Sequence, residues 1–244
     1  MPQPKALVIR APRDQLRGKA ARTRNSPGAS AEIRHIGRLL EDPDGLLDFP
    51  ILTIPGGFSY GDDLGTGRIV ARRRAPSPPR PGGLTLGICN GFQVLVKAGL
   101  LPGGPIPATL TRNDTGHYEA RWVRLACTPG LSPFVTDDEP IELPSAHGEG
   151  KFLTADGAAL GSGQVVFRYL DGSGQPTEQF PANPNGSPGG VAGVCDPTGR
   201  ILGLMPHPER NVDPLHHPRW TRRPASTEGD GLRIFRNAVN ALRS

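Results

Sequence analysis

The chain has 244 residues, 36% of them hydrophobic, and its 28 lysines and arginines against 23 aspartates and glutamates give a formal net charge of +5. This length predicts a single α/β domain over residues 1–244 that can bury a sizeable core. No apolar run approaches the roughly 18 residues that a membrane helix needs, and no export signal pattern opens the sequence. We therefore expect a cytoplasmic protein that makes no membrane contact.

The positive charge is concentrated in two short segments. Residues 10–24 hold six basic residues and one acidic residue, and residues 68–80 hold five basic residues and no acidic one. Outside them, 17 basic and 22 acidic residues remain, so the body of the protein is acidic. Neither segment carries the interleaved aromatic side chains on which bases stack, and we expect no nucleic-acid partner.

Short apolar runs mark the predicted strands. In chain order they are residues 5–10, 49–54, 84–88, 121–126, 164–169, 190–195 and 201–205. The first three show no alternation and lead into turns, which favours a mostly parallel sheet covered by helices on both faces, an α/β fold. After residue 89, apolar residues recur at helical spacing up to Gly99, and a second helix is predicted from Asp230 to Leu242.

Two stretches do not fit this pattern. Residues 11–30 offer Leu16 as their only large apolar residue, and the last six positions of residues 72–83 hold five prolines and glycines. Neither stretch can supply the crossover helix that should join parallel strands at these places. We hypothesise that both are local frame slips or segments without fixed structure, and resequencing the gene would test the first idea.

Of the three cysteines, Cys89 has the sequence surroundings expected of a catalytic nucleophile. It lies between Gly87 and Gly91 where a predicted strand becomes a helix, the geometry of a nucleophile elbow with sulfur in place of oxygen. The positive end of a helix dipole favours the reactive thiolate. The other two cysteines, Cys127 and Cys195, form no C-x-x-C pair with it, so we predict no disulfide framework and expect both in the core.

His207 and Glu209 supply a candidate base for this thiol. Pro206 and Pro208 exclude a regular helix, so we expect an extended segment in which residues two apart point the same way. A carboxylate bonded to one ring nitrogen fixes the tautomer and leaves the other nitrogen to exchange a proton with sulfur. Taken alone, the segment could equally be a surface loop; together with the cysteine elbow it predicts a catalytic triad.

A glycine-rich segment, P-G-G-F-S-Y-G-D at residues 55–62, follows a strand expected beside the one that leads to Cys89. Glycines allow backbone N–H groups to face a site. We expect Gly57, Phe58 and Asn90 to bind the substrate or its developing oxyanion through such groups. A plain glycine turn is the alternative.

Six segments occur in an order that is typical of one family. They are P-G-G-F-S-Y-G-D at 55–62, G-I-C-N-G-F-Q at 87–93, A-G-L-L-P-G at 98–103, A-H-G-E-G at 146–150, A-N-P-N-G-S at 182–187 and M-P-H-P-E-R at 205–210. This set resembles the glutaminase of phosphoribosylformylglycinamidine synthase, a class I glutamine amidotransferase. The segments at 146–150 and 182–187 separate this family from other class I amidotransferases, which would share the catalytic motifs alone.

The resemblance implies a three-layer, flavodoxin-like class I amidotransferase fold in which Cys89 is the nucleophile and His207 and Glu209 complete the triad. It implies hydrolysis of glutamine to glutamate and ammonia through a cysteine thioester. The ammonia would pass to a separate ATP-dependent synthetase that makes formylglycinamidine ribonucleotide in purine biosynthesis. The expected partners are glutamine, that synthetase and a small accessory subunit, with ATP and magnesium on the synthetase and no cofactor on this chain.

His147 and Glu149 belong to the A-H-G-E-G segment. As a zinc pair they lack further ligands at usable spacing, so no metal site is predicted. We expect them to line a substrate or partner surface.

Three other interpretations stay open. A class I glutaminase of another synthase would keep the chemistry and change the partner. A related cysteine hydrolase would need no partner and would ignore glutamine. A non-catalytic binding subunit would never form a thioester.

Overall fold

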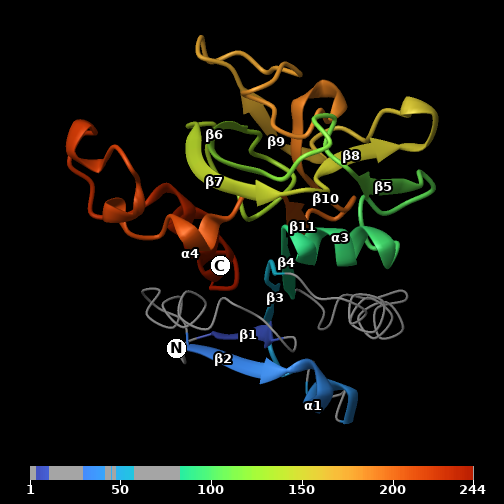
Figure 1. The fold of residues 1–244 in the computed structure, drawn as a ribbon. Coiled ribbons are helices and arrows are strands. Elements are labelled where there is room, and N and C mark those ends of the chain that lie inside the picture. The colour runs from blue at the N-terminus through green and yellow to red at the C-terminus, as the bar shows by residue number, and fades with distance from the viewer. Residues whose placement is uncertain (1–3, 11–29, 42–44, 46–47, 58–82, 244) are drawn as a thin grey trace.

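The structure is a computed structural model, and it describes residues 4–10, 30–41, 45, 48–57 and 83–243. Its strands are β1 (Lys5–Arg10), β2 (Ser30–His35), β3 (Ile51–Ile54), β4 (Leu84–Ile88), β5 (Ala108–Thr111), β6 (Glu119–Cys127), β7 (Ile141–His147), β8 (Lys151–Thr154), β9 (Val165–Leu170), β10 (Val191–Cys195) and β11 (Ile201–Leu204). Its α-helices are α1 (Ile36–Glu41), α3 (Asn90–Lys97) and α4 (Asp230–Asn240). One sheet has the order β2-β1-β3-β4-β11-β10-β9-β6-β7, and β5 pairs with β8 in a small second sheet (Figure 1).

Strand direction divides the large sheet into two parts. From β2 to β11 each neighbouring pair is parallel, and from β11 to β7 each neighbouring pair is antiparallel. Because each antiparallel pair reverses direction, β9 and β7 run the same way as the five parallel strands, and β10 and β6 run against them. The parallel part has the 2-1-3-4-5 order of a flavodoxin-like sheet. The predicted α/β class with a mostly parallel sheet is confirmed.

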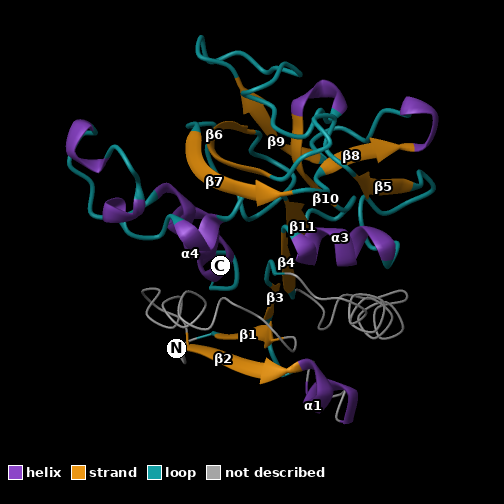
Figure 2. Cartoon of the chain, viewed as in Figure 1, coloured by secondary structure: helices purple, strands orange, loops and turns teal. Residues whose placement is uncertain are grey.

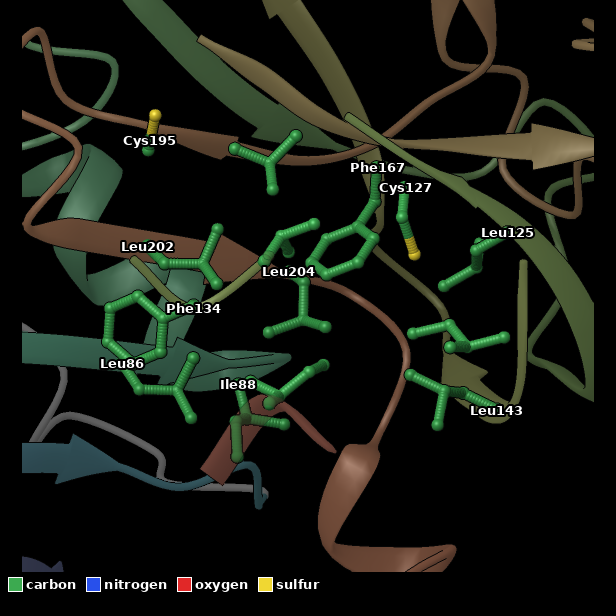
Figure 3. Close-up of a cluster of buried hydrophobic side chains, with 14 of the residues drawn as sticks. Leu86, Ile88, Leu125, Cys127, Phe134, Leu143, Phe167, Cys195, Leu202 and Leu204 are labelled. Carbon is green, nitrogen blue, oxygen red and sulfur yellow. The ribbon is translucent and has the colours of Figure 1, made fainter. Parts of the chain in front are cut away.

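Helices α3 and α4 cover opposite faces of the parallel strands (Figure 2). Alternate residues of a strand point to opposite faces, and they divide here into two cores. The core under α4 includes Leu84, Leu86, Ile88, Leu202, Leu204, Ile234, Ala238 and Val239. The core under α3 includes Leu7, Ile9, Leu52, Ile54, Phe92, Val94, Leu95 and Ile201. Figure 3 shows Leu86, Ile88, Leu202 and Leu204 meeting Phe134 and Phe167 in the first of these cores.

Helix α3 packs closely on the sheet because glycines occupy the facing strand positions. A Cβ on Gly203 of β11 would lie 2.1 Å from Cδ2 of Phe92, and one on Gly87 of β4 would lie 2.5 Å from Cδ1 of Leu95. A side chain at either position would force the helix outward. This close packing holds the first turn of α3 at the carboxyl ends of β3, β4 and β11.

All seven predicted strands form, and four strands were missed. Strand β7 contains Pro144, which counts against a strand in a sequence. The structure shows why it is tolerated: among the described strands, β7 lies at the edge of the sheet and pairs with β6 alone. Strands β2, β5 and β8 mix polar with apolar residues, so they lack the apolar runs used to predict the others.

The two predicted helices are confirmed. Helix α3 ends at Lys97 and is followed by Gly99, whose φ is 71°. Helix α4 begins at Asp230 as predicted, but its most buried stripe is Gly231, Ile234 and Ala238. Of the apolar residues expected to face the core, Val239 is buried as predicted, and Leu232, Phe235 and Leu242 are half-buried.

The two stretches that do not fit the pattern lie almost wholly outside the described residues. Of residues 11–30 the structure describes Ser30, where β2 begins, and of residues 72–83 it describes Gly83. The frame-slip hypothesis therefore stays a prediction. Within the described part of the chain, no helix has the length and apolar character to span a membrane.

Candidate active site

The predicted nucleophile and base lie at the ends of two neighbouring strands. Strands β4 and β11 are parallel, with Ile88 opposite Leu204, and the N–H of Cys89 donates to the carbonyl of Leu204 at 2.8 Å. The chain then leaves β11 through Pro206 to His207. Because parallel neighbours end at the same edge of the sheet, this pairing brings together residues that are far apart in sequence.

Cys89 has the backbone conformation of a nucleophile elbow. Its φ is 52° and its ψ is −106°, a left-handed conformation that is uncommon outside glycine, and the next residue begins α3. A Cβ on Gly91 would lie 2.0 Å from the carbonyl oxygen of Ile54, and one on Gly87 would lie 2.7 Å from the carbonyl oxygen of Gly91. The predicted need for glycine on both sides of the cysteine is confirmed.

His207 and Glu209 form a buried pair. Nδ1 of His207 lies 2.7 Å from Oε1 of Glu209, and the two side chains are 1% and 5% exposed. The expected extended segment is wrong in detail, because residues 208–210 form a short 3-10 turn that Pro208 opens. Proline is compatible with the first position of a helical turn. A carboxylate only accepts hydrogen bonds, so Nδ1 carries a hydrogen and Nε2 is the nitrogen available to sulfur.

Gly56 marks the point where Cys89 and His207 meet. A Cβ built on this glycine would lie 2.7 Å from Cε1 of His207 and 3.1 Å from Cβ of Cys89. The sulfur and the imidazole therefore flank one small space at the end of β3, on the same edge of the sheet. Within the described residues, Nε2 of His207 has no partner at ordinary hydrogen-bond geometry. Cys89 nevertheless lies close enough to raise the pKa of His207.

Charge reinforces this pairing. Burial alone would lower the pKa of His207, but the carboxylate of Glu209 and the side chain of Cys89 raise it to about 9. Burial alone would raise the pKa of Glu209, but the His207 imidazole holds it below its ordinary value. Both directions favour an imidazolium that is paired with the carboxylate of Glu209 beside Cys89.

Comparisons with known proteins identify the family of this chain. A family model, the CobB/CobQ-like glutamine amidotransferase domain, matches residues 3–241. The chain is 42% identical over 255 aligned positions to phosphoribosylformylglycinamidine synthase subunit PurQ of Dehalococcoides mccartyi, covering 100% of this chain and 99% of that protein. The chain belongs to the PurQ family of glutamine amidotransferases.

Two further comparisons agree with this family. The PurQ subunit of Nostoc sp. is 44% identical over 213 residues, which covers 83% of each protein. Among solved structures, a chain of PurLQS from Thermotoga maritima has a TM-score of 0.73 at 29% identity and covers 98% of this chain and 99% of its own. The similarity therefore extends over the whole length of both chains.

Two of the three expected oxyanion residues, Gly57 and Asn90, are next to Gly56 and Cys89 in the chain. Gly57 follows Gly56 with φ of 154°, and Asn90 is the first residue of α3, next to Cys89. Phe58 lies outside the described residues. The side chain of Asn90 donates to Oε1 of Gln93 at 3.0 Å, so it is used to brace the first turn of the helix.

His147 and Glu149 have different surroundings. His147 ends β7 and is buried, whereas the Glu149 side chain is exposed. The backbone carbonyl of Glu149 accepts a hydrogen bond from Nε2 of Gln93 at 2.6 Å, which ties this loop to the nucleophile helix. Within the described residues, no group of three or more His, Cys, Asp or Glu is arranged to hold a metal ion.

Several contacts at the site were missed from the sequence. The carbonyl oxygen of Ala146 lies 3.8 Å from Sγ of Cys89, and a Cβ on Gly231 would lie 2.0 Å from the carbonyl oxygen of Pro208. Gly231 therefore lets α4 pack against the turn that carries Glu209. The sequence signal that could have pointed to Ala146 is its place in the A-H-G-E-G segment, whereas a single glycine in a helix gives no comparable signal.

The remaining cysteines have the buried positions expected of them. Cys127 and Cys195 are free and lie in the core under α4. Burial raises the pKa of each thiol to about 12. Neither can supply a thiolate near neutral pH, so Cys89 is the cysteine suited to nucleophilic chemistry.

Proposed function

We propose that this chain is the glutaminase subunit of phosphoribosylformylglycinamidine synthase in purine biosynthesis. It hydrolyses glutamine to glutamate and ammonia through a glutamyl thioester on Cys89. The observation that carries this proposal is the meeting of Cys89 and His207 around Gly56, with Glu209 bonded to the far side of the imidazole. The name and full-length similarity of the PurQ relatives support the choice of synthase.

The reaction begins with attack of the Cys89 thiolate on the carboxamide carbon of glutamine. Backbone N–H groups of Gly57 and Asn90 would hold the oxyanion that forms, and Phe58 would contribute in the same way. His207, charged and oriented by Glu209, gives its Nε2 proton to the amide nitrogen, the C–N bond breaks and ammonia leaves. The neutral imidazole then takes a proton from water, whose oxygen attacks the thioester and releases glutamate.

The ammonia would be used by a partner protein. The solved PurLQS structure contains proteins named together as one assembly, which supports an ATP-dependent synthetase as the partner and a small accessory subunit beside it. ATP and magnesium would bind to the synthetase, and this chain would need no cofactor. Three free cysteines suit a reducing compartment, and we place the complex in the cytoplasm.

Glutamate release from glutamine tests the proposal. The wild type and Cys89→Ala are compared with and without the synthetase. We expect the substitution to reduce release by about 10³-fold or more, because the covalent route is lost. The Cys195→Ala variant is the matched control. It removes a buried thiol that is distant from the end of β4, where Cys89 lies, and it should keep its turnover.

The same assay separates the alternatives. Stimulation by a different synthase, but not by the purine enzyme, would assign the chain to another pathway. Activity that ignores glutamine would indicate a cysteine hydrolase of another type. Turnover that survives Cys89→Ala would overturn the proposed chemistry.

A further inference from the structure

A second buried histidine lies next to the nucleophile and is not used by the mechanism above. His147 is 3% exposed and is the last residue of β7. The carbonyl of the residue before it, Ala146, touches Sγ of Cys89. The charge of His207 acts on its imidazole. His147 therefore directly follows the residue whose carbonyl contacts the nucleophile, and its imidazole lies within electrostatic reach of His207.

Asn113 fixes the orientation of this imidazole through a full set of hydrogen bonds. Its Nδ2 donates to the carbonyls of His117 and His147, each at 2.9 Å. Its Oδ1 accepts from the N–H of Gly150 at 3.1 Å and lies 3.0 Å from Nδ1 of His147. A backbone N–H can only donate and a carbonyl can only accept, so the amide of Asn113 cannot be turned round.

The tautomer of His147 follows from this arrangement. Oδ1 of Asn113 is an acceptor, so Nδ1 of His147 must carry the hydrogen between them. In a neutral ring the other nitrogen, Nε2, then has a lone pair. Within the described part of the chain Nε2 is buried and has no hydrogen-bond partner. A buried acceptor without a donor costs free energy, and a bound ligand with an N–H or O–H group would relieve that cost.

The surroundings select the kind of donor. Burial and the neighbouring His207 lower the pKa of His147 to about 4, with Glu119 on β6 acting in the opposite direction. The ring therefore stays neutral at the pH where His207 is charged. Beside that imidazolium a second cation such as an α-ammonium group is disfavoured, whereas a neutral amide N–H is accepted at no charge cost.

We propose that Asn113 is a positioning residue that holds His147 as the Nδ1–H tautomer, so that Nε2 accepts a hydrogen bond from the carboxamide N–H of glutamine. When the carboxamide nitrogen leaves as ammonia, Nε2 of His147 accepts a hydrogen bond from that ammonia. Because the ring carries no hydrogen on Nε2, it cannot convert ammonia to ammonium, and the product leaves in its reactive form. This inference rests on the proposed glutaminase activity and adds an amide subsite to it.

The test compares two substrates with different leaving groups. Glutamine presents an amide N–H, and glutamate γ-methyl ester reacts at the same carbon but has no N–H in its leaving group. In the complex with the synthetase, His147→Leu and Asn113→Ala should each lower kcat/KM for glutamine by about five- to tenfold, the effect of one lost neutral hydrogen bond. Hydrolysis of the ester should change less than twofold.

Gln164→Ala is the matched control. Gln164 is also a buried amide, and its side chain bonds to the backbone of Pro102, Cys195 and Gly161, beyond the carboxyl end of α3. This variant should leave the ratio of the two activities unchanged. Equal losses on both substrates in His147→Leu, or no loss on either, would overturn the proposal. A wild type that hydrolyses neither substrate would instead refute the glutaminase assignment.

A second measurement does not depend on any variant folding. Nitrogen-15 NMR of the histidine side chains should show His147 as a neutral ring with its hydrogen on Nδ1 between pH 6 and 8. An Nε2–H tautomer, or a charged ring in this range, would contradict the inference.

Discussion

His207 and His147 are two buried histidines at the ends of neighbouring structural elements, and both use Nδ1 to donate to a side-chain oxygen. The oxygen belongs to the carboxylate of Glu209 in one case, at 2.7 Å, and to the amide of Asn113 in the other, at 3.0 Å. The pKa rises to about 9 for the first ring and falls to about 4 for the second. Since both rings are buried, the charge of the partner decides which imidazole becomes an acid and which stays a neutral acceptor.

Glu209→Gln is the substitution with the largest expected effect, because it gives His207 an amide partner like that of His147. Burial would then lower the pKa of His207 without a carboxylate to oppose it, and the imidazolium that protonates the departing amide nitrogen would be lost. We expect kcat/KM for glutamine to fall by about 10²- to 10³-fold. The alkaline limb of the pH profile, expected near pH 9 in the wild type, should move to lower pH. A limb that stays in place would show that Glu209 does not set the charge of His207.

Gly56→Ala tests the meeting point itself. The added methyl group would lie 2.7 Å from Cε1 of His207, closer than atoms pack, so the ring must move away from the sulfur. We expect about a 10²-fold loss of kcat/KM, because catalytic groups tolerate little displacement. Gly104→Ala is a control for an added methyl group, since a Cβ there meets nothing within 4 Å, although its φ of 75° adds backbone strain. Full activity in Gly56→Ala would show that the site has more room than the structure gives it.

Asn113→Asp performs the reverse exchange and gives His147 a carboxylate. Its pKa should rise towards neutrality, so that Nε2 gains a hydrogen and becomes a donor as the pH falls. We expect kcat/KM for glutamine to drop about tenfold at the acid end of the profile and to recover as the pH rises. The pH profile distinguishes this from a purely structural defect, which would lower activity at every pH. An unchanged profile would count against the acceptor role of His147.

The two histidines also predict opposite pH dependences of stability. The pKa of His207 lies above its ordinary value of 6.5, so its stabilising contribution is present below that pH and is lost as the pH rises through about 9. The pKa of His147 lies below 6.5, so the unfolded chain binds the proton first and stability is lost as the pH falls towards 4. Each effect is on the order of 3 kcal/mol. Urea unfolding of His147→Leu should show a weaker loss between pH 6.5 and 4 than the wild type does.

The sequence predicted the triad because its members carry strong local signals. Glycines flank Cys89 and prolines flank His207. These patterns can be recognised in the sequence without knowledge of the fold. The sequence could not show that Gly56 is the contact point or that Asn113 braces His147. The contact at Gly56 depends on β3, β4 and β11 ending together at one edge of the sheet. The contact of Asn113 with His147 depends on the end of β7, and β7 was missed because its proline is tolerated only at a sheet edge. Phe58 and most of the two atypical stretches lie outside the described residues, so those predictions stay untested.

The covalent intermediate gives the most direct test of the central claim. The protein is mixed with glutamine, quenched with acid within the first turnover, digested and measured by mass spectrometry. We predict a glutamyl adduct on the peptide that contains Cys89, and none on the peptides with Cys127 or Cys195. Glutamine turnover with the adduct on another residue, or with no adduct and undiminished activity in Cys89→Ala, would contradict it.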